Sequence, residues 1–361
     1  MSICRESGMV GLMLLLTAVL RLQALALNLR ELRLLAVEHN ITCALVFGDS
    51  TVDPGNNNHL ATTFKSDFPP YGKDFFGGRP TGRFTNGRLP TDLLAEEFGI
   101  SRMIPAFLDK GLKKTDLLHG VSFASAGSGY DDLTAHFTNV LPFSKQIEYL
   151  MHYQIHLRAL VGEKRAAEIV SNAVFVLSAG TNDFIQNYYL EPTRAKQFTL
   201  DGYLDYLISC MSANIKEMHK LGGTRFAVVG VPPMGCLPLV KTLMGTTGCV
   251  DSYNKAAESF NSKIKAELAT LKKALGVKTV YADCYGALLN ATMNPMKYGF
   301  TETSKGCCGS GVIEFGGTCK GESTCEDTNK YVFWDSVHPT ERMYRLIADD
   351  AIRSLSTEFF A

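Results

Sequence analysis

The stretch ALVFGDS, residues 44–50, indicates the fold of this 361-residue chain, because four apolar residues run directly into a glycine, a carboxylate and a hydroxyl. A short continuous apolar run that ends at a glycine is typical of a strand buried on both faces of a parallel sheet. Four further runs of this kind follow along the chain, at 121–124, 173–177, 226–231 and 277–281. The sequence therefore predicts a mainly parallel, roughly five-stranded sheet.

Amphipathic helical patterns lie between these runs and after the last one. They cover residues 89–98, 144–161, 200–221, 251–275 and 341–355. Strands that alternate with helices favour an α/β fold, here a three-layer α/β/α sandwich with right-handed crossovers. Ligands of such folds bind outside the carboxyl ends of the strands, so the functional residues are expected directly after the apolar runs.

The overall composition is that of an ordinary globular protein. Hydrophobic residues make up 46% of the chain, which is enough apolar material for a large core and excludes intrinsic disorder. Lysine plus arginine and aspartate plus glutamate each number 36, so the formal net charge is zero. Because nucleic-acid binding needs a basic field, no nucleic-acid partner is predicted.

The N-terminal residues have the pattern of a secretory signal peptide. A basic residue precedes the apolar run 9–20, and an Ala-Leu-Ala triplet ends at Ala26. The run is too short for a transmembrane span of about 20 residues. We therefore predict a signal peptide at 1–26, a single mature domain at 27–361, no stable membrane span, and a secreted, extracellular protein. An uncleaved anchor is the alternative, because residues 22–35 are rich in leucine.

The cysteines agree with export. Nine of the ten lie in the mature chain, so at least one is unpaired, and Cys284 is the candidate because it follows an apolar run. Cys236 and Cys249 bracket a segment with proline and glycine, and we predict that they pair. Two more disulfides are predicted among the cysteines of a glycine-rich segment, Cys307, Cys308, Cys319 and Cys325. The adjacent Cys307 and Cys308 are not expected to pair with each other. Each is expected to bond to Cys319 or Cys325, and the sequence does not say which bonds to which. A zinc site is the alternative, although the usual C-x2-4-C pairs are missing.

Two N-x-T triplets are candidate glycosylation acceptors in a secreted protein. They begin at Asn40 and Asn290.

Polar groups follow the first three predicted strands and precede the final helix. They are Gly48-Asp49-Ser50, Ser125-Ala126-Gly127, Gly180-Thr181-Asn182-Asp183 and Asp335-Ser336-Val337-His338-Pro339. Together they supply a serine, backbone N–H groups beside glycines, an amide side chain and an Asp/His pair. These are the parts required for acyl transfer by a nucleophilic serine.

In this order and at these positions, the four blocks resemble the plant members of the GDSL esterase/lipase family, which belong to the SGNH hydrolases. The resemblance covers residues 44–354. It includes further plant-type segments: VDPGNNN (52–58), GRFTNGR (82–88), FASAGSGYDD (123–132), GCCGSG (306–311) and YVFWDSVHPT (331–340). The chain departs from the pattern at Thr51, where the family name has leucine, and in its long lead-in over residues 27–42.

The resemblance implies a flavodoxin-like SGNH hydrolase fold and a secreted serine esterase or lipase. Ser50 is the expected nucleophile, His338 the base, and Asp335 the carboxylate that orients the imidazole. The histidine lies three residues after the aspartate, which we expect to be about one helical turn at the start of the final helix. The oxyanion hole is expected to consist of the Ser50 N–H, the Gly127 N–H and the Asn182 amide.

Other readings of single residues are less favoured. Asp49 and Asp183 are expected to bind backbone N–H groups and hold their loops, rather than to form a catalytic pair. His152 and His156 are interpreted as part of a solvated helix face, because no H-E-x-x-H motif is present, and no metal site is predicted.

Whole-protein alternatives are also less favoured. No G-x-S-x-G elbow of an α/β-hydrolase and no nucleotide-binding glycine motif occurs, so no cofactor is predicted. A catalytically silent lipid- or glycan-binding protein on the same fold remains the alternative function.

The expected substrate is an ester, which could be a lipid, a small ester or an acylated cell-wall polymer. Four phenylalanines suggest an acyl pocket, although core packing explains them equally well: Phe64, Phe68, Phe75 and Phe76.

Overall fold

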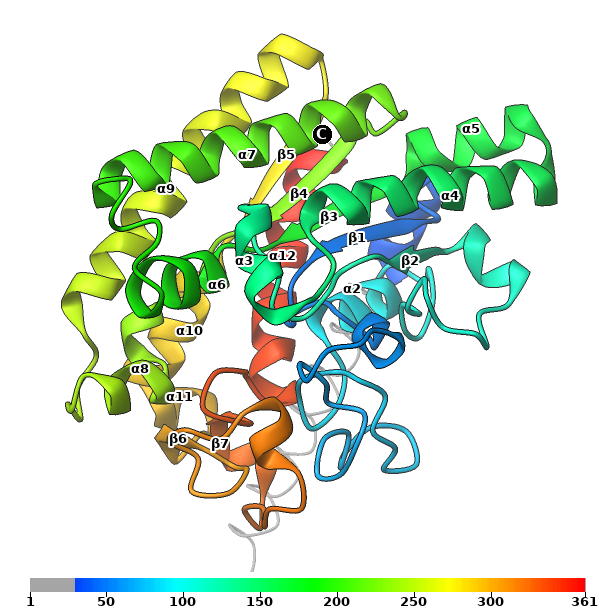
Figure 1. Ribbon diagram of the computed structural model, residues 1–361. Helices are drawn as coiled ribbons and strands as arrows, with labels where there is room; N and C mark the ends of the chain where they lie inside the picture. Colours follow the sequence, from blue (N-terminus) through cyan, green and yellow to red (C-terminus); the bar gives the residue numbers. More distant parts are fainter. Residues whose placement is uncertain (1–29, 361) are drawn as a thin grey trace, which may run out of the picture.

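A five-stranded parallel sheet forms the centre of the structure, a computed structural model that describes residues 30–360 (Figure 1). Its strands are β1 (Ala44–Gly48), β2 (Gly120–Ser122), β3 (Val174–Ser178), β4 (Arg225–Val229) and β5 (Lys278–Ala282). The strand order is β2-β1-β3-β4-β5, and every neighbouring pair is parallel. This is the flavodoxin-like order, so the predicted sheet and fold class are confirmed. The predicted signal peptide lies outside the described residues.

The strand β2 is shorter than the apolar run 121–124 that predicted it. The backbone still follows β1 beyond Ser122, because the Phe123 and Ser125 N–H groups donate to the Val46 and Gly48 carbonyl oxygens at 2.7 and 2.9 Å. Asn56 Nδ2 also binds this segment, donating to the carbonyl oxygens of Ser122 and Ala124 at 2.8 Å each.

Helices cover both faces of the sheet. Their bounds are α2 (Pro90–Glu97), α3 (Asp132–Thr138), α4 (Phe143–Val161), α5 (Glu163–Asn172), α6 (Thr181–Phe184), α7 (Leu200–Lys220), α8 (Pro238–Leu243), α9 (Asp251–Leu275), α10 (Cys284–Met293), α11 (Pro295–Tyr298) and α12 (Glu341–Phe359). Helices α4, α7 and α9 pack on one face, and α2 and α12 pack on the other (Figure 1). All five predicted helical segments are helices with bounds within a few residues of those predicted.

The two faces of the sheet carry side chains of different size. The face toward α4, α7 and α9 is aromatic: Phe47 stacks on Phe123 and Phe175, with ring centroids 4.9 and 6.1 Å away. The buried apolar side chains that the strands present toward α12 are alanine and valine: Ala44, Val46, Val174, Val176, Ala227, Val280 and Ala282. The second face therefore offers less volume to fill the space beneath the helix.

Beyond the main sheet, the C-terminal part contains a small parallel pair, β6 (Glu302–Gly306) and β7 (Tyr331–Phe333). Disulfides restrain the chain around this pair. The structure contains Cys307–Cys325 and Cys308–Cys319, together with the predicted Cys236–Cys249.

The disulfide prediction is thereby confirmed, and its open connectivity is resolved. Three of the described cysteines are free: Cys43, Cys210 and Cys284. Cys284 is thus unpaired, as predicted, and it is the first residue of α10.

No helix within residues 30–360 combines the length and the apolar character needed to cross a membrane.

Candidate active site

The polar residues identified in the sequence meet at the carboxyl edge of the sheet. Ser50 follows β1, Gly127 lies in the loop after β2, and Asn182 lies in α6 directly after β3. In the sheet, β2 lies on one side of β1 and β3 lies on the other, so the direction in which successive strands are added reverses at β1. This reversal of strand order is where doubly wound folds bind their ligands.

Ser50, His338 and Asp335 form a continuous hydrogen-bonded chain. The Ser50 Oγ lies 2.7 Å from His338 Nε2, and His338 Nδ1 lies 2.8 Å from Asp335 Oδ2. Ser50 and His338 lie 288 positions apart in the sequence. All three residues are almost fully buried, with exposed fractions of 8% for Ser50, 3% for His338 and 0% for Asp335. This arrangement matches the geometry of a nucleophile, a base and a group that orients the base.

One expectation about this trio was wrong. His338 does not lie at the start of a helix, because α12 begins three residues later at Glu341. Asp335 instead forms a tight turn, in which its Oδ1 accepts the backbone N–H groups of Val337 and His338 at 2.9 and 2.7 Å. The carboxylate therefore fixes the backbone and the imidazole together.

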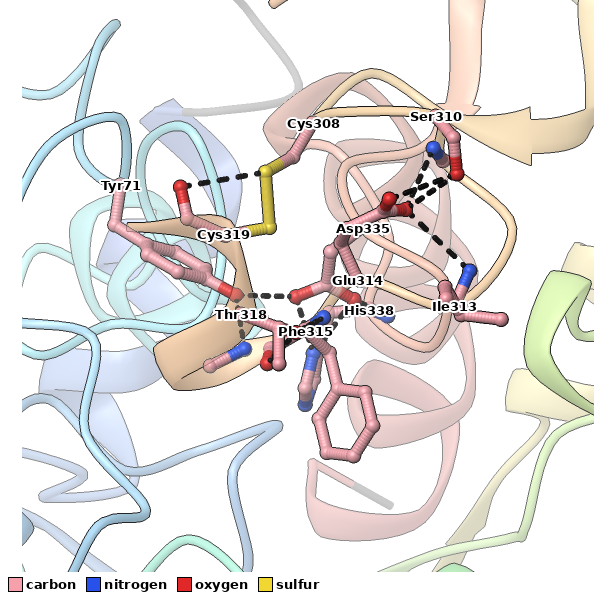
Figure 2. Close-up of a disulfide and its surroundings, with 12 residues drawn as sticks. Tyr71, Cys308, Ser310, Ile313, Glu314, Phe315, Thr318, Cys319, Asp335 and His338 are labelled. Atoms are coloured by element: carbon pink, nitrogen blue, oxygen red, sulfur yellow. Dashed lines mark hydrogen bonds and ion pairs between the residues drawn. A yellow bond between two sulfur atoms is a disulfide. The ribbon is translucent and has the colours of Figure 1, made fainter. Parts of the chain in front are cut away.

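Tyr71 is a partner of the trio that the sequence analysis missed. Its hydroxyl donates to Asp335 Oδ2 at 2.7 Å and accepts from the Gly316 N–H at 2.6 Å (Figure 2). Burial, together with the Asp335 charge, raises the pKa of Tyr71 well above its ordinary value, so the hydroxyl keeps its proton. Gly316 belongs to the loop closed by the Cys308–Cys319 disulfide, so Tyr71 links that loop to the Asp/His turn.

Gly48 and Asp49 set the position of the Ser50 loop. Gly48 has φ +141°, and a Cβ there would lie 1.9 Å from the Ser178 carbonyl oxygen, so only glycine fits. Asp49 Oδ1 accepts from the Thr51 N–H and hydroxyl at 2.9 and 2.7 Å. Burial raises the pKa of Asp49. The expected loop-holding role of this aspartate is consistent with these bonds.

Gly127 and Asn182 lie on the neighbouring loops. Gly127 has φ +89°, and a Cβ there would come within 3.0 Å of the Phe64 ring. Asn182 Nδ2 donates to the Ser128 carbonyl oxygen at 2.9 Å, and its Oδ1 accepts from Gln186 at 3.1 Å. An amide has two hydrogens, so one N–H of Asn182 remains for a ligand.

Gln146 of α4 is a second group that the sequence analysis missed. Its Oε1 accepts from the Gly48 N–H at 2.8 Å, and its Nε2 donates to the Gly48 carbonyl oxygen at 2.9 Å. The same nitrogen lies 3.1 Å from Ser128 Oγ. One buried amide thus holds the end of β1 against the loop that carries Gly127.

The segment VDPGNNN binds the same loop from the other side. Asp53 Oδ2 accepts from the Ala126 N–H at 3.0 Å, and Asn57 Nδ2 donates to the Ala126 carbonyl oxygen at 2.9 Å. Burial raises the pKa of Asp53 to about 6. Both side chains are fully buried, so this segment supports the loop from within.

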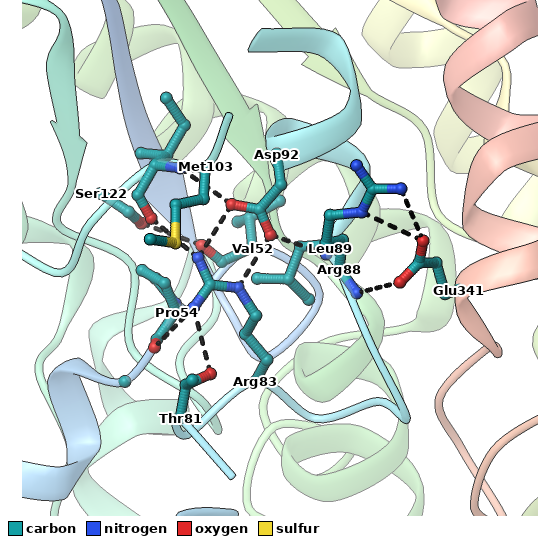
Figure 3. A network of polar contacts seen from close by, with 12 residues as sticks. Val52, Pro54, Thr81, Arg83, Arg88, Leu89, Asp92, Met103, Ser122 and Glu341 are labelled. Atoms are coloured by element: carbon teal, nitrogen blue, oxygen red, sulfur yellow. Dashed lines mark hydrogen bonds and ion pairs between the residues drawn. The ribbon is translucent and has the colours of Figure 1, made fainter. Parts of the chain in front are cut away.

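The segment GRFTNGR anchors the start of α12 (Figure 3). Arg83 makes two hydrogen bonds of 2.8 Å to the buried Asp92 carboxylate. Arg88 contacts Glu341 through its backbone N–H at 2.7 Å and its guanidinium at 2.9 Å. Thr85, which lies between the two arginines in the sequence, donates its hydroxyl to the Pro339 carbonyl oxygen at 2.9 Å. This segment therefore fixes the chain directly after His338.

Asp183 is a fully buried carboxyl group near the site. It accepts from the Tyr130 N–H at 2.8 Å, the Asp131 N–H at 3.2 Å and the Thr134 hydroxyl at 2.5 Å. Burial raises its pKa to about 8 despite these donors. Its contacts are internal to the loops, as expected for a residue that holds them.

An open cleft of about 320 Å³ lies over the trio. Ser50, Gly127, Asn182 and His338 all line it. The apolar part of its wall consists mainly of Phe64, Phe84, Phe137, Ile185, Leu190 and Phe315.

Of the four phenylalanines that suggested an acyl pocket, only Phe64 lines this cleft. Phe68 packs against Tyr71, and Phe75 and Phe76 contact each other and nearby arginines.

Three peripheral residues complete the set singled out in the sequence. Asn40 and Asn290 are exposed, as a glycosylation acceptor must be. His152 lies 4.0 Å from Glu148 on an exposed part of α4.

The comparisons with known proteins agree with the resemblance. The profile of the family described as GDSL-like Lipase/Acylhydrolase matches residues 45–351. An Arabidopsis thaliana protein named GDSL esterase/lipase At5g45950 is 52% identical over 335 residues, which cover 93% of this chain and 94% of the relative. The GDSL esterase/lipase APG of the same plant is 42% identical over 341 residues, with 93% and 94% coverage.

Among solved structures, a catalytic mutant of Axe2 is similar with a TM-score of 0.40 and 12% identity, covering 88% of this chain and 95% of that one. It is described as an acetylxylan esterase from Geobacillus stearothermophilus.

The family profile and the relatives define the class of this protein as a carboxylic ester hydrolase. The chain belongs to the GDSL-like lipase/acylhydrolase family, and the resemblance noted in the sequence is confirmed.

Proposed function

We propose that this protein hydrolyses esters through an acyl-enzyme formed on Ser50. As Ser50 Oγ attacks the ester carbonyl carbon, His338 Nε2 takes the hydroxyl proton, and the carbonyl electron pair moves onto its oxygen. His338 then gives this proton to the alkoxide oxygen as the bond to the alcohol breaks. A water molecule next attacks the acyl-enzyme by the same route, which releases the acid and restores the Ser50 hydroxyl.

Asp335 and the oxyanion hole support these steps. Asp335 holds the imidazole in the tautomer whose Nε2 accepts the proton, and its charge stabilises the imidazolium that forms. The negative oxygen of the tetrahedral intermediate is stabilised by the Ser50 N–H, the Gly127 N–H and the free N–H of Asn182.

The observation that carries this proposal is the unbroken Ser50–His338–Asp335 chain at 2.7 and 2.8 Å, exposed to the cleft at its serine end.

The decisive experiment compares two serine variants. Ser50→Ala should lower ester hydrolysis by about 10⁴-fold or more while the protein still folds, because only a small hydroxyl is lost. Ser336→Ala is the matched control: it also removes a buried serine hydroxyl, one that has no hydrogen-bond partner among residues 30–360, and it should remain active. The substrates are p-nitrophenyl esters from acetate to palmitate, with acetylated xylan alongside.

The outcomes separate the two candidate functions. Labelling of Ser50 by an organophosphonate, and loss of this labelling in His338→Ala, would support the acyl-enzyme. A folded Ser50→Ala protein with near-normal turnover would refute the assignment of the nucleophile. Wild-type protein that binds lipid or glycan but hydrolyses none of the panel would favour the silent binding protein.

We also propose that residues 1–26 are removed on secretion and that residues 27–361 act as one domain. The disulfides support an oxidising compartment, because cytosolic thiols are normally kept reduced. The exposure of Asn40 and Asn290 supports glycosylation at either site. N-terminal sequencing and glycosidase treatment of the exported protein test these points.

A further inference from the structure

A second cavity begins at Ser50 and extends away from the open cleft. Its volume is about 80 Å³, and it shares Ser50, Asn182, Val337 and His338 with the cleft. From there it runs into the layer between the sheet and α12, where Ala351 and Leu355 line it. We call it the sheet–helix cavity. Ser50 thus stands between an open cleft and a narrow interior space.

The strand register gives the direction of the sheet–helix cavity. Ser178 and Val229 pair across β3 and β4 near its mouth, and Val176 and Ala227 pair two residues deeper. At about 3.3 Å per residue, the deeper pair lies about 7 Å further from the carboxyl edge. A separate pocket of about 30 Å³ adjoins it, shares wall residues such as Val176 and Leu355, and reaches Val174. The two spaces together extend about 13 Å along the strands.

The walls explain why this space is unfilled. The sheet presents Val176, Ala227 and Ala282 to the cavity, and α12 presents the small Ala348 and Ala351 among the larger Tyr344, Ile347 and Leu355. The alanine and valine side chains leave space between these two layers, whereas aromatic residues fill the opposite face of the sheet. An empty apolar cavity costs stability, because the atoms around it lose packing contacts. A ligand with an apolar chain would restore those contacts.

The chemistry at Ser50 indicates which part of an ester fits here. In the acyl-enzyme the acyl group stays bonded to Ser50, while the alcohol must leave and water must enter. An enclosed apolar space suits the group that stays, and the open cleft suits the exchange of alcohol and water. The small volume of the cavity, about 80 Å³, favours an unbranched chain.

We propose that the sheet–helix cavity binds the linear acyl chain of a long-chain ester, with the alcohol portion in the open cleft. This inference rests on the proposed acyl-enzyme at Ser50 and specifies its substrate class. An acetyl group would occupy only the mouth, whereas a long alkyl chain would reach the level of Ala227 and Ala351.

The first test blocks the cavity at depth. Ala351→Leu places extra apolar volume in the cavity from α12, and Thr357→Leu adds the same side chain at an exposed position of the same helix. In Ala351→Leu, kcat/KM for the palmitate ester should fall by about tenfold or more relative to the acetate ester, because several methylene contacts are excluded. Thr357→Leu should change this ratio by no more than about twofold. An unchanged ratio in folded Ala351→Leu would overturn the proposal.

The second test uses the wild-type protein, so it does not depend on the folding of a variant. Cys284 lines the sheet–helix cavity, whereas Cys210 is a free cysteine of α7 on the other side of the sheet. The protein is treated with an ethylphosphonate or a dodecylphosphonate that reacts with Ser50. It is then exposed to iodoacetamide, and each cysteine is followed by peptide mass spectrometry.

The dodecyl adduct should slow modification of Cys284 by about tenfold relative to the ethyl adduct, because the alkyl chain fills the space beside the thiol. Cys210 should react equally in both. Equal reactivity of Cys284 in the two adducts would refute the proposed acyl site and leave the nucleophile intact. Failure of both phosphonates to label Ser50 would instead refute the proposed function on which the inference rests.

Discussion

Replacing Tyr71 with phenylalanine tests how the Asp/His turn is held in place. The hydroxyl of Tyr71 makes two hydrogen bonds, one to the Asp335 carboxylate at 2.7 Å and one from the Gly316 N–H at 2.6 Å. Tyr71 is 1% exposed, so phenylalanine keeps the packing, and water does not readily replace the lost oxygen.

The size of the effect follows from the charge of Asp335. A hydrogen bond to a charged group contributes about 1.5–3 kcal/mol, so the free energy of unfolding of Tyr71→Phe should fall by about that amount. If the whole loss is expressed in the transition state, kcat/KM falls by about 10- to 100-fold. His338 and two backbone N–H groups still bind the carboxylate, so activity is lowered and not abolished.

A pH profile distinguishes positioning from general destabilisation. Without the Tyr71 donor, the Asp335 carboxylate is less stabilised, and an imidazolium beside it forms more readily. The acid limb of the kcat/KM profile should therefore move to higher pH in Tyr71→Phe. Tyr130→Phe is the matched control, because the Tyr130 hydroxyl is buried without a hydrogen-bond partner among the described residues. An unmoved acid limb with normal activity in Tyr71→Phe would refute this reasoning.

Three further outcomes are expected. Asn182→Ala should lower kcat by about 10²–10³-fold with little change in KM, and a raised KM at constant kcat would instead indicate ground-state binding. Reduction should impair ester hydrolysis before tryptophan fluorescence reports unfolding, because the Cys308–Cys319 loop supports Asp335 through Tyr71; full activity after reduction confirmed by mass spectrometry would contradict this coupling. Burial raises the pKa of Asp183 from its ordinary 3.8 to about 8, so the unfolded chain loses this proton at a lower pH than the folded protein does. Tm should therefore fall between about pH 4 and about pH 8 and level off above, and a rising Tm over that range would count against a buried neutral Asp183.

The sheet and the main helices could be predicted from the sequence because their signals are local. A strand buried on both faces needs apolar residues at every position, so runs such as 173–177 stand out. Helix bounds were equally accessible, and the predicted 251–275 coincides with α9. The pairing of the adjacent cysteines could not be predicted, because spacing alone does not say which sulfur atoms approach each other.

The candidate site was predictable only where residues form short motifs. Ser50, Asn182 and His338 lie in recognisable blocks, and the structure brings them to one cleft. Tyr71 and Gln146 belong to no comparable pattern. Their partners lie 264 and 98 positions away, and nothing near them in the sequence marks these contacts. The turn that holds His338 was predicted as helix, because D-x-x-H spacing fits both structures.

The difference between the two faces of the sheet explains how a rigid nucleophile can lie beside an unfilled interior. Phe47 and Phe175 pack tightly on the side of α4, and Gln146 binds both backbone groups of Gly48 from the same side. These contacts hold the end of β1 from the side of α4. The other face is free to carry alanine and valine toward α12, and the space beneath Ser50 can vary in length without moving the serine. Substitutions in the later turns of α12, around Ala351, are thus expected to change which esters fit, while Glu341 at the start of the helix helps to hold the chain after His338.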